Sequence, residues 1–158
     1  MQSKEEIEKW YSKEDPWSYK TTQDDLDRKK IIINFLDGYI YEKVLDLGCG
    51  EGFITTNLPA KEIHGLEISD TASARFPNNI KRVLAPEGKY DLVTTMGTMY
   101  KQYNHAEIYE WIKSSATKHI LIAGIDSWLL PYDYGKLLKE KKYKYRQFEQ
   151  ILQLYEVQ

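Results

Sequence analysis

Short apolar runs divide the chain after residue 43 into segments typical of alternating strands and helices. Each run has the length of a buried strand, and helix-length segments separate them. Parallel neighbours in a sheet need long crossover connections, so this alternation predicts a parallel sheet with helices on both faces. The four runs are Val44–Leu47, Ile63–Ile68, Tyr90–Thr94 and His119–Ala123.

The segments between and after these runs complete the predicted order of elements. They predict a short helix over 69–75, a strand over 80–84, an amphipathic helix over 105–115, a helix near 132–141 and two final strands within 143–157. Within helix 105–115, Ile108, Trp111 and Ile112 are expected to point inward. The count of strands is therefore seven.

The N-terminal part reads as two helices joined by an aromatic loop. Apolar residues over 31–36 recur at helical spacing after a polar stretch that can cap a helix, which predicts a helix over about 23–37. A short helix around 7–11 should end before the Asp15-Pro16 step, because proline disfavours helical geometry in the preceding residue. We expect one domain over 1–158, with 1–37 as N-terminal cap helices.

A glycine-rich loop follows the first strand in the stretch VLDLGCGEGF, residues 44–53. Gly48, Gly50 and Gly52 would let ligand atoms approach backbone N–H groups without obstruction by a Cβ atom. The strand before and the helix expected after predict an adenosine-type ligand, against the alternative of an ordinary tight turn. Glu67 ends the next strand, where its carboxylate either accepts hydrogen bonds from both ribose hydroxyls or is solvated.

Four stretches together resemble the class I S-adenosylmethionine-dependent methyltransferases. They are VLDLGCGEG, IHGLEIS, YDLVTTMGTMY and HILIAG, and they span about residues 43–123. The resemblance implies a Rossmann-like α/β fold with an antiparallel final strand, S-adenosyl-L-methionine as cofactor and S-adenosyl-L-homocysteine as product. A dinucleotide oxidoreductase is the nearest competitor, but its fingerprint is G-x-G-x-x-G, whereas this loop is G-x-G-x-G.

The family's cofactor contacts can be carried over residue by residue. Glu67 would bind the ribose, and Ile68 would pack on the adenine. The backbone of Ala85 stands where many relatives have an acidic residue that bonds the adenine amino group. The glycine loop would contribute Asp46, Gly48, Cys49, Gly50 and Gly52, and the end of the fourth strand Thr95, Met96 and Gly97.

The stretch DPWSYKTTQDDLDRKKIIINFL, residues 15–36, is similar to the N-terminal region of the nodulation-protein-S-like branch of small-molecule methyltransferases. This resemblance implies that Trp17 and Tyr19 close over the cofactor and that Arg28 reaches its carboxylate. A guanidinium fork matches carboxylate geometry. The alternative is that the two aromatic side chains only pack and that Arg28 is a solvated helix residue.

Candidate catalytic residues follow the fourth and fifth strands. Alignment alone contributes much to transfer from a sulfonium, so an amine that has lost its proton needs no dedicated base. An alcohol acceptor would need one, and Tyr100, His105 and Asp126 are the candidates. Each has a structural alternative: Tyr100 as a packing aromatic, His105 as a surface residue at a helix start, and Asp126 as a loop carboxylate or helix cap.

Composition narrows the partners and the compartment. A net charge of -2 and a pI near 6.0 provide no overall basic field, which disfavours nucleic acid, and the lysines over 136–144 read as a solvated helix face. Cys49 is the only cysteine, the first residues are charged, and no apolar run approaches the ~20 residues that span a bilayer. We therefore expect a soluble, cytoplasmic protein without a membrane span, and no Cys/His cluster suggests a metal.

The leading functional prediction is methyl transfer to an amino or hydroxyl group of a small, for instance sugar-like, molecule. One alternative is methylation of RNA or protein. Another is a partner subunit that binds the cofactor without catalysing a reaction. Neither the acceptor nor the oligomeric state can be read from the sequence.

Overall fold

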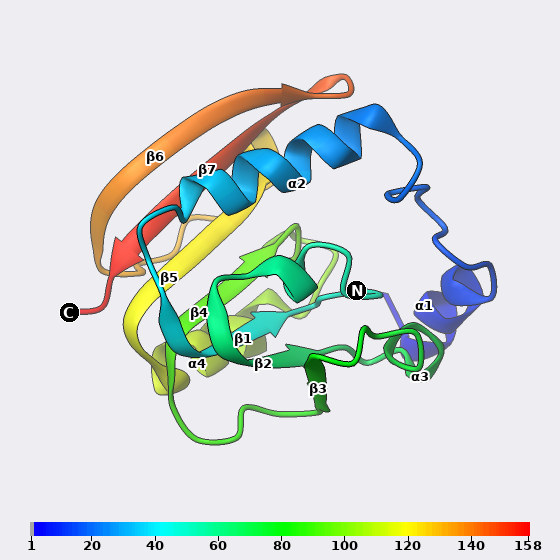
Figure 1. The fold of residues 1–158 in the computed structure, drawn as a ribbon, viewed down its shortest axis with the longest axis horizontal. Helices are drawn as coiled ribbons and strands as arrows, with labels where there is room; N and C mark the ends of the chain where they lie inside the picture. Colours follow the sequence, from blue (N-terminus) through cyan, green and yellow to red (C-terminus); the bar gives the residue numbers. More distant parts are fainter. Residues whose placement is uncertain (1) are drawn as a thin grey trace.

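One seven-stranded sheet organises the chain (Figure 1). The computed structural model describes residues 2–158, so the first residue of the predicted domain and cap lies outside it. The strand order is β3-β2-β1-β4-β5-β7-β6, in which β7 is antiparallel to both of its neighbours and the pairs from β3 to β5 are parallel. The predicted mostly parallel α/β sheet is thereby confirmed. The strands are β1 (Tyr41–Leu47), β2 (Ala60–Leu66), β3 (Ile80–Val83), β4 (Tyr90–Met96), β5 (Ala116–Ile125), β6 (Lys136–Tyr145) and β7 (Phe148–Glu156).

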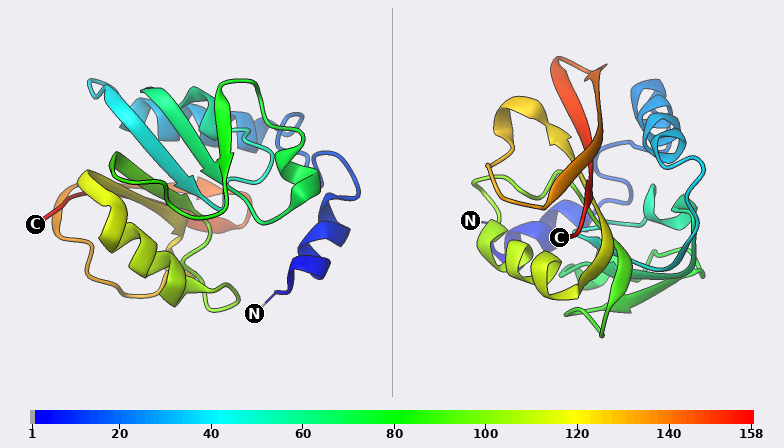
Figure 2. Two further views of the ribbon diagram at one scale, coloured as in Figure 1. Left: turned by 90° about the horizontal axis from the view of Figure 1, so that it is seen from below. Right: turned by 90° about the vertical axis from the view of Figure 1, so that its left-hand side faces the viewer.

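Helices cover both faces of this sheet (Figure 2). Successive strand residues point to opposite faces, so neighbours such as Val44 and Leu45 enter different cores. Val44 packs in the core that contains Ile32 of α2 (Gln23–Phe35), and Leu45 packs in the core that contains Ile112 of α4 (His105–Ser115). All four side chains are fully buried.

The other helices are short and lie near the carboxyl ends of the strands. In Figure 1, α1 (Lys4–Tyr11) lies beside α3 (Asp70–Ser73), and α2 runs along the hairpin of β6 and β7. Helices α3 and α4 and strand β3 confirm the predicted segments, and Ser69 caps α3 as its side chain accepts from the Ala72 N–H. Thr22 precedes α2 but makes no capping hydrogen bond with its side chain. Within residues 2–158, no helix has both the length and the apolarity to cross a membrane.

The helix predicted near 132–141 is wrong, because these residues enter β6 at Lys136. The run KLLKEKKYKY is rich in residues that favour helices, but its pairing with β7 decides the structure. Alternate side chains, including Lys139 and Tyr143, turn toward the core under α2, and the Lys139 amine lies 4.4 Å from the centroid of the Phe35 ring. The lysines thus belong to an edge strand and not to a helix face, and the first of the two final strands begins earlier than predicted.

The α-helix that was predicted to follow the glycine loop does not form. Only residues 48–59 separate β1 from β2, and three glycines in this segment have positive φ, which is incompatible with a right-handed helix. What remains forms one short 3-10 helix, Thr55–Asn57. Any ligand at this loop therefore meets backbone turns and side chains instead of the end of a long helix.

Candidate functional site

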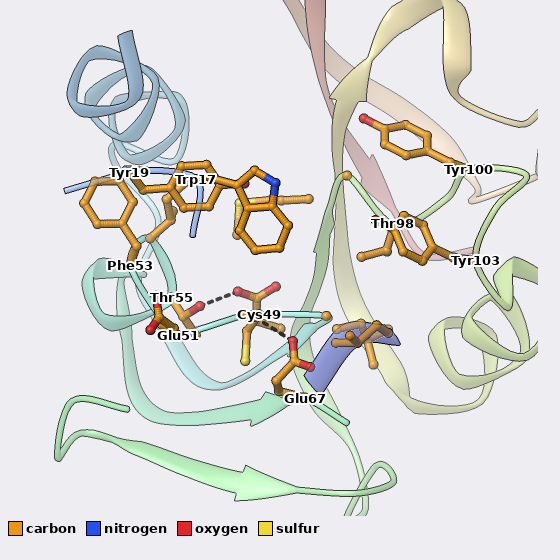
Figure 3. A pocket seen from close by; sticks show the side chains of 18 of the residues that line it. Trp17, Tyr19, Cys49, Glu51, Phe53, Thr55, Glu67, Thr98, Tyr100 and Tyr103 are labelled. Atoms are coloured by element: carbon orange, nitrogen blue, oxygen red, sulfur yellow. Dashed lines mark hydrogen bonds between the residues drawn. The ribbon is translucent and has the colours of Figure 1, made fainter. Parts of the chain in front are cut away.

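The carboxyl ends of β1, β2 and β4 open into a cavity of about 650 Å³. Open α/β sheets bind ligands at this edge, and the volume lies in the range of about 300–1,000 Å³ of small-molecule sites. The N-terminal segment, the start of α4 and the tip of the β6–β7 hairpin complete its walls. Figure 3 shows side chains that surround it from the N-terminal segment, the glycine loop and the segment after β4.

The glycine loop lies against the cavity in a conformation that side chains disfavour. Gly48 and Gly50 have φ values of +75° and +59°. A Cβ atom at Gly50 would lie 2.8 Å from the Tyr11 hydroxyl oxygen, and one at Gly48 would collide with Thr98. The two glycines therefore allow the side chains of Thr98 and Tyr11 to approach the loop backbone closely.

Glu67, directly after β2, holds the loop from the other side. Its Oε1 accepts a hydrogen bond from the Gly50 N–H at 2.9 Å, and its Oε2 accepts one from the Ser69 N–H at 2.9 Å. Burial raises the pKa of this carboxyl, while the two backbone donors act in the opposite direction. A carboxylate oxygen has two lone-pair sites, so Glu67 can still accept from two ligand hydroxyls.

Asp46 is a buried carboxylate with one oxygen unused. Its Oδ2 accepts from the Thr55 hydroxyl at 2.6 Å, whereas Oδ1 has no partner within residues 2–158. Burial raises the pKa of Asp46 to about 7. Because the side chain borders the cavity, Oδ1 is a ready acceptor for a cationic or N–H-bearing ligand group.

Aromatic rings from the N-terminal segment form one wall of the cavity. Trp10, Trp17, Tyr19 and Phe53 stack in sequence with centroid separations of 5.8, 5.8 and 6.0 Å. In Figure 3, three of these rings, those of Trp17, Tyr19 and Phe53, gather on the side of the cavity near α2. The stack bridges the N-terminal segment to the residue that directly follows the glycine loop.

A charged cluster continues this wall. Asp25 is fully buried in α2, accepts from the Tyr145 hydroxyl at 2.5 Å and pairs with Arg146 Nη2 at 2.8 Å. Arg28 Nε lies 3.8 Å from Asp25 Oδ1, and its guanidinium carbon lies 5.3 and 5.2 Å from the ring centroids of Tyr19 and Tyr145. The cluster joins α2 to the hairpin tip across the cavity wall.

The opposite wall carries Tyr100 and Tyr103, which Figure 3 shows across the cavity from Trp17 and Tyr19. The Tyr100 hydroxyl oxygen accepts a hydrogen bond from the Ile125 N–H at 2.6 Å. Burial raises the pKa of Tyr100 to about 12. At neutral pH this phenol is therefore protonated, and it can donate a hydrogen bond but cannot act as a base.

Most of the residues predicted from the sequence border this single cavity. Tyr100 is the only candidate base among them. The others come from the N-terminal segment and from the ends of β1, β2 and β4. They are Trp17, Tyr19, Arg28, Asp46, Gly48, Cys49, Gly50, Glu67, Ile68, Met96 and Gly97.

Five predicted residues do not line the cavity. Each of them is either exposed to solvent or in contact with other residues of the protein. A Cβ atom at Gly52 would lie 2.5 Å from Ile80 Cδ1, so this glycine permits packing. Ala85 is exposed after β3, and the hydroxyl of buried Thr95 bonds to that of Thr98. His105 Nδ1 lies 2.6 Å from the Tyr132 hydroxyl, and Asp126 forms an ion pair with Lys142 at 3.0 Å.

Several residues at the cavity carry no motif that the sequence analysis could use. Phe53 follows the glycine loop directly, and the mixed aromatic and basic tip of the hairpin was read only as part of a strand. The remaining residues come from segments whose proximity depends on the tertiary fold. Among the missed residues are Tyr11, Phe53, Thr98, Tyr103, Trp128, Arg146, Phe148 and Gln150.

Comparison with known proteins identifies the fold. No protein-family model matches the sequence, and no curated protein matches it. The structure is similar to the N-methyltransferase NodS from Bradyrhizobium japonicum in complex with S-adenosyl-L-homocysteine, with a TM-score of 0.79 and 12% identity over 97% of both chains. It is also similar to the magnesium protoporphyrin IX methyltransferase ChlM from Synechocystis with bound S-adenosylmethionine, with a TM-score of 0.71 and 15% identity over 100% of this chain and 98% of that one. The chain therefore has the class I methyltransferase fold, as the sequence motifs predicted.

Proposed function

We propose that this protein is an S-adenosylmethionine-dependent methyltransferase that acts on a small molecule. The observation that carries the proposal is the combination of a glycine loop with positive φ values, Glu67 and the unpartnered Oδ1 of Asp46 around one cavity. The two structural neighbours, crystallised with the product and with the cofactor, support the same assignment.

The lining residues fit the parts of this cofactor. Glu67 would accept hydrogen bonds from the ribose hydroxyls, and Ile68, 40% exposed beside it, would pack on the adenine. Asp46 would bind the ammonium group through Oδ1, and Arg28 would bind the carboxylate. When bound, S-adenosylmethionine would supply the methyl group of its sulfonium to the acceptor by in-line displacement. S-adenosylhomocysteine would be the leaving group.

The contribution of the protein to such a transfer would be alignment. Met96 ends β4 and Gly97 follows it; both line the cavity, where they can frame the reacting centre. Orientation alone can supply effective molarities of roughly 10⁵ M or more. Of the three predicted bases only Tyr100 borders the cavity, and it is protonated at neutral pH. This favours an amine acceptor whose nitrogen lone pair is free, with its proton released to water after transfer.

The cover over the cavity supports a small acceptor. Helix α1 is attached to α3 by Lys4 and Asp70, whose charged groups lie 3.1 Å apart, and by the Thr71 hydroxyl, which donates to Glu8 at 2.6 Å. Tyr11 at the end of α1 and Asp15 in the loop after it contact the glycine loop, which leaves less open surface there for a polymeric substrate. Methylation of RNA or protein is the alternative, and the assay described below includes RNA and cell extract among the tested acceptors.

Calorimetric titration with S-adenosylmethionine and S-adenosylhomocysteine tests the proposal. Both should bind and raise the melting temperature, because they stabilise the native state by mass action. Glu67→Gln should weaken binding by about 1–3 kcal/mol, since charge-assisted hydrogen bonds are lost. Glu42→Gln is the matched control, because Glu42 is exposed and forms an ion pair with Lys61 at the far end of β1.

The outcomes separate the competing functions. The absence of both binding heat and a thermal shift at millimolar cofactor, with the protein folded, would overturn the proposal. Preferential binding of a nicotinamide dinucleotide would favour an oxidoreductase. Binding without formation of S-adenosylhomocysteine, in the presence of amines, alcohols, RNA and cell extract, would favour a non-catalytic partner subunit.

A further inference from the structure

The cavity end near the β6–β7 hairpin carries more positive than negative charge. Arg28 and Arg146 both border the cavity there, and both pair with the single buried carboxylate of Asp25. One carboxylate can neutralise only one of the two guanidinium groups. If Arg28 binds the carboxylate of the cofactor, as proposed above, Arg146 remains available to a second ligand.

The geometry of Arg146 leaves part of its guanidinium free. The residue lies at the hairpin turn with a φ of +54°, and its Nη2 donates to Asp25 Oδ2 at 2.8 Å and to the Trp17 carbonyl oxygen at 3.1 Å. Its Nη1 and Nε have no hydrogen-bond partner within residues 2–158. Because Nη2 is held on one side, the other nitrogens can present donors to an anion.

Two polar side chains, Gln150 and Tyr143, lie opposite each other on the β-strands that the Arg146 turn connects. Gln150 of β7 is only 5% exposed as a residue, and it borders the cavity. Its register partner on β6 is Tyr143, whose buried hydroxyl has no partner within residues 2–158. Of the two, only Gln150 lines the cavity, so its side-chain amide is the group that can meet a polar ligand group there.

Aromatic rings flank the same end of the cavity. The ring centroid of Trp128 lies 5.6 Å from that of Tyr100 and 5.2 Å from that of Phe148, both in edge-to-face arrangement. Trp128 is 44% exposed although it is large and apolar, and all three side chains border the cavity. Such walls suit a planar ring, since aromatic pairs favour stacked or edge-to-face contacts.

We propose that the methyl acceptor is a planar aromatic amine that also bears a carboxylate, held through the carboxylate by Arg146 and Gln150 and through its ring by Trp128 and Phe148. A carboxylate matches the planar guanidinium fork, and the side-chain amide of Gln150 can donate to the second oxygen. This inference rests on the proposed methyl transfer, because it assigns Arg28 to the cofactor and Arg146 to the acceptor.

Binding of benzoate to the protein saturated with S-adenosylhomocysteine tests the inference. Benzoate and its neutral isostere benzamide would be titrated separately. Inorganic phosphate would serve as a non-aromatic anion. Binding would be followed by the NMR shifts of side-chain amide and guanidinium groups. Benzoate should bind at least tenfold more tightly than benzamide or phosphate. Arg146→Gln should weaken benzoate at least tenfold, while Lys142→Gln, which removes a charge from the same hairpin outside the cavity, should leave it unchanged.

Gln150→Leu provides a second variant that leaves the Arg146 contacts to Asp25 and Trp17 in place. It should also weaken benzoate while the affinity for S-adenosylhomocysteine stays within twofold of the wild type. Equal binding of benzoate and benzamide, tighter binding of phosphate, or wild-type benzoate affinity in both variants would overturn the inference, as would the absence of benzoate binding. Failure of S-adenosylhomocysteine to bind would instead overturn the proposed function.

Discussion

The two ends of the cavity are built in different ways. At the glycine-loop end, Gly48, Gly50 and Asp46 are nearly consecutive in the sequence, and backbone N–H groups provide the main contacts to Glu67. At the hairpin end, Asp25 and Arg146 are 121 positions apart and meet through charged side chains. The first end depends on local backbone conformation, whereas the second depends on the docking of α2 against β6 and β7.

This difference predicts different responses to substitution. A change at the glycine loop should affect ligand binding more than the fold, because the loop borders the cavity. A change in the buried charged cluster should affect stability first, since the cluster connects three distant segments. Four experiments test that distinction.

The largest effect is expected at Asp25. Asp25→Asn should lower the free energy of unfolding by about 3 kcal/mol, because removal of one partner of a buried ion pair leaves the other charge uncompensated. The Tyr145 hydroxyl would also lose its carboxylate acceptor. Chemical denaturation monitored by circular dichroism measures the change.

Asp70 offers a matched control for that experiment. It also lies between two cations, Lys4 at 3.1 Å and Arg82 at 2.8 Å, but its side chain is 66% exposed. Asp70→Asn should therefore change stability little, since solvent screens exposed ion pairs. If the two variants were equally stable, the hairpin end would not depend on its buried carboxylate.

At the glycine loop, Gly50→Val should weaken S-adenosylhomocysteine binding by about 2–3 kcal/mol, because the side chain overpacks the wall near Tyr11. Gly38→Val is the control, since Gly38 has a φ of +86° and no atom lies within 4 Å of the position that a Cβ atom would take there. Both variants strain the backbone, but only the first obstructs the cavity. Equal cofactor affinities, measured by calorimetry on the folded variants, would contradict this role of the loop.

The buried carboxyl of Asp46 makes a smaller, pH-dependent contribution. Burial raises its pKa from 3.8 to about 7, so in the ligand-free protein it is mostly protonated at pH 6. Binding of a cationic amino group requires the ionised form. The affinity for S-adenosylhomocysteine should therefore be roughly tenfold weaker at pH 6 than at pH 8, about 1.4 kcal/mol.

The same shift has the opposite sign for folding. A carboxyl with a raised folded-state pKa keeps its proton in the native state while the unfolded chain loses it, so stability should fall as the pH rises from about 4 to 7. Asp46→Asn should remove this slope and flatten the pH profile of cofactor affinity. A wild-type affinity independent of pH would show that Asp46 does not bind the amino group in its ionised form.

The glycine-loop end could be predicted because its constraints act on neighbouring residues. Positive φ at Gly48 and Gly50 and a carboxylate at the end of the next strand leave a readable pattern. The lack of a helix after the loop was not readable from the glycines alone, because it depends also on how soon β2 begins. The motif thus located the site but not its full backbone geometry.

The hairpin end could not be predicted for a physical reason. Lysine, leucine and glutamate dominate residues 136–142 and favour helices locally, while hydrogen bonding to β7 makes this segment a strand. An edge strand rich in lysine also gives little hydrophobic alternation. Without a predicted hairpin, nothing in the sequence places Arg146 beside Asp25. The acceptor side of the cavity therefore could not be predicted.

The smallest expected effect joins the two ends through the segment 12–22. Asp15 holds this loop by accepting from the Tyr19 and Lys20 N–H groups at 2.8 and 3.0 Å, and its own N–H donates to Glu51 at the glycine loop. Trp17 contacts the hairpin through the hydrogen bond from Arg146 to its carbonyl oxygen. A segment held by a few contacts at both ends should open locally and be stabilised by a ligand beneath it.

Hydrogen exchange measured peptide by peptide should therefore slow over residues 12–22 when S-adenosylhomocysteine binds. Peptides from the middle of β5, which is buried and paired on both sides, should change little and serve as the internal control. Arg146→Gln should reduce the ligand-induced protection without abolishing it, because the contact to Glu51 remains. Equal exchange with and without saturating ligand would leave Trp17 and Tyr19 as packing residues and would separate the N-terminal segment from cofactor binding.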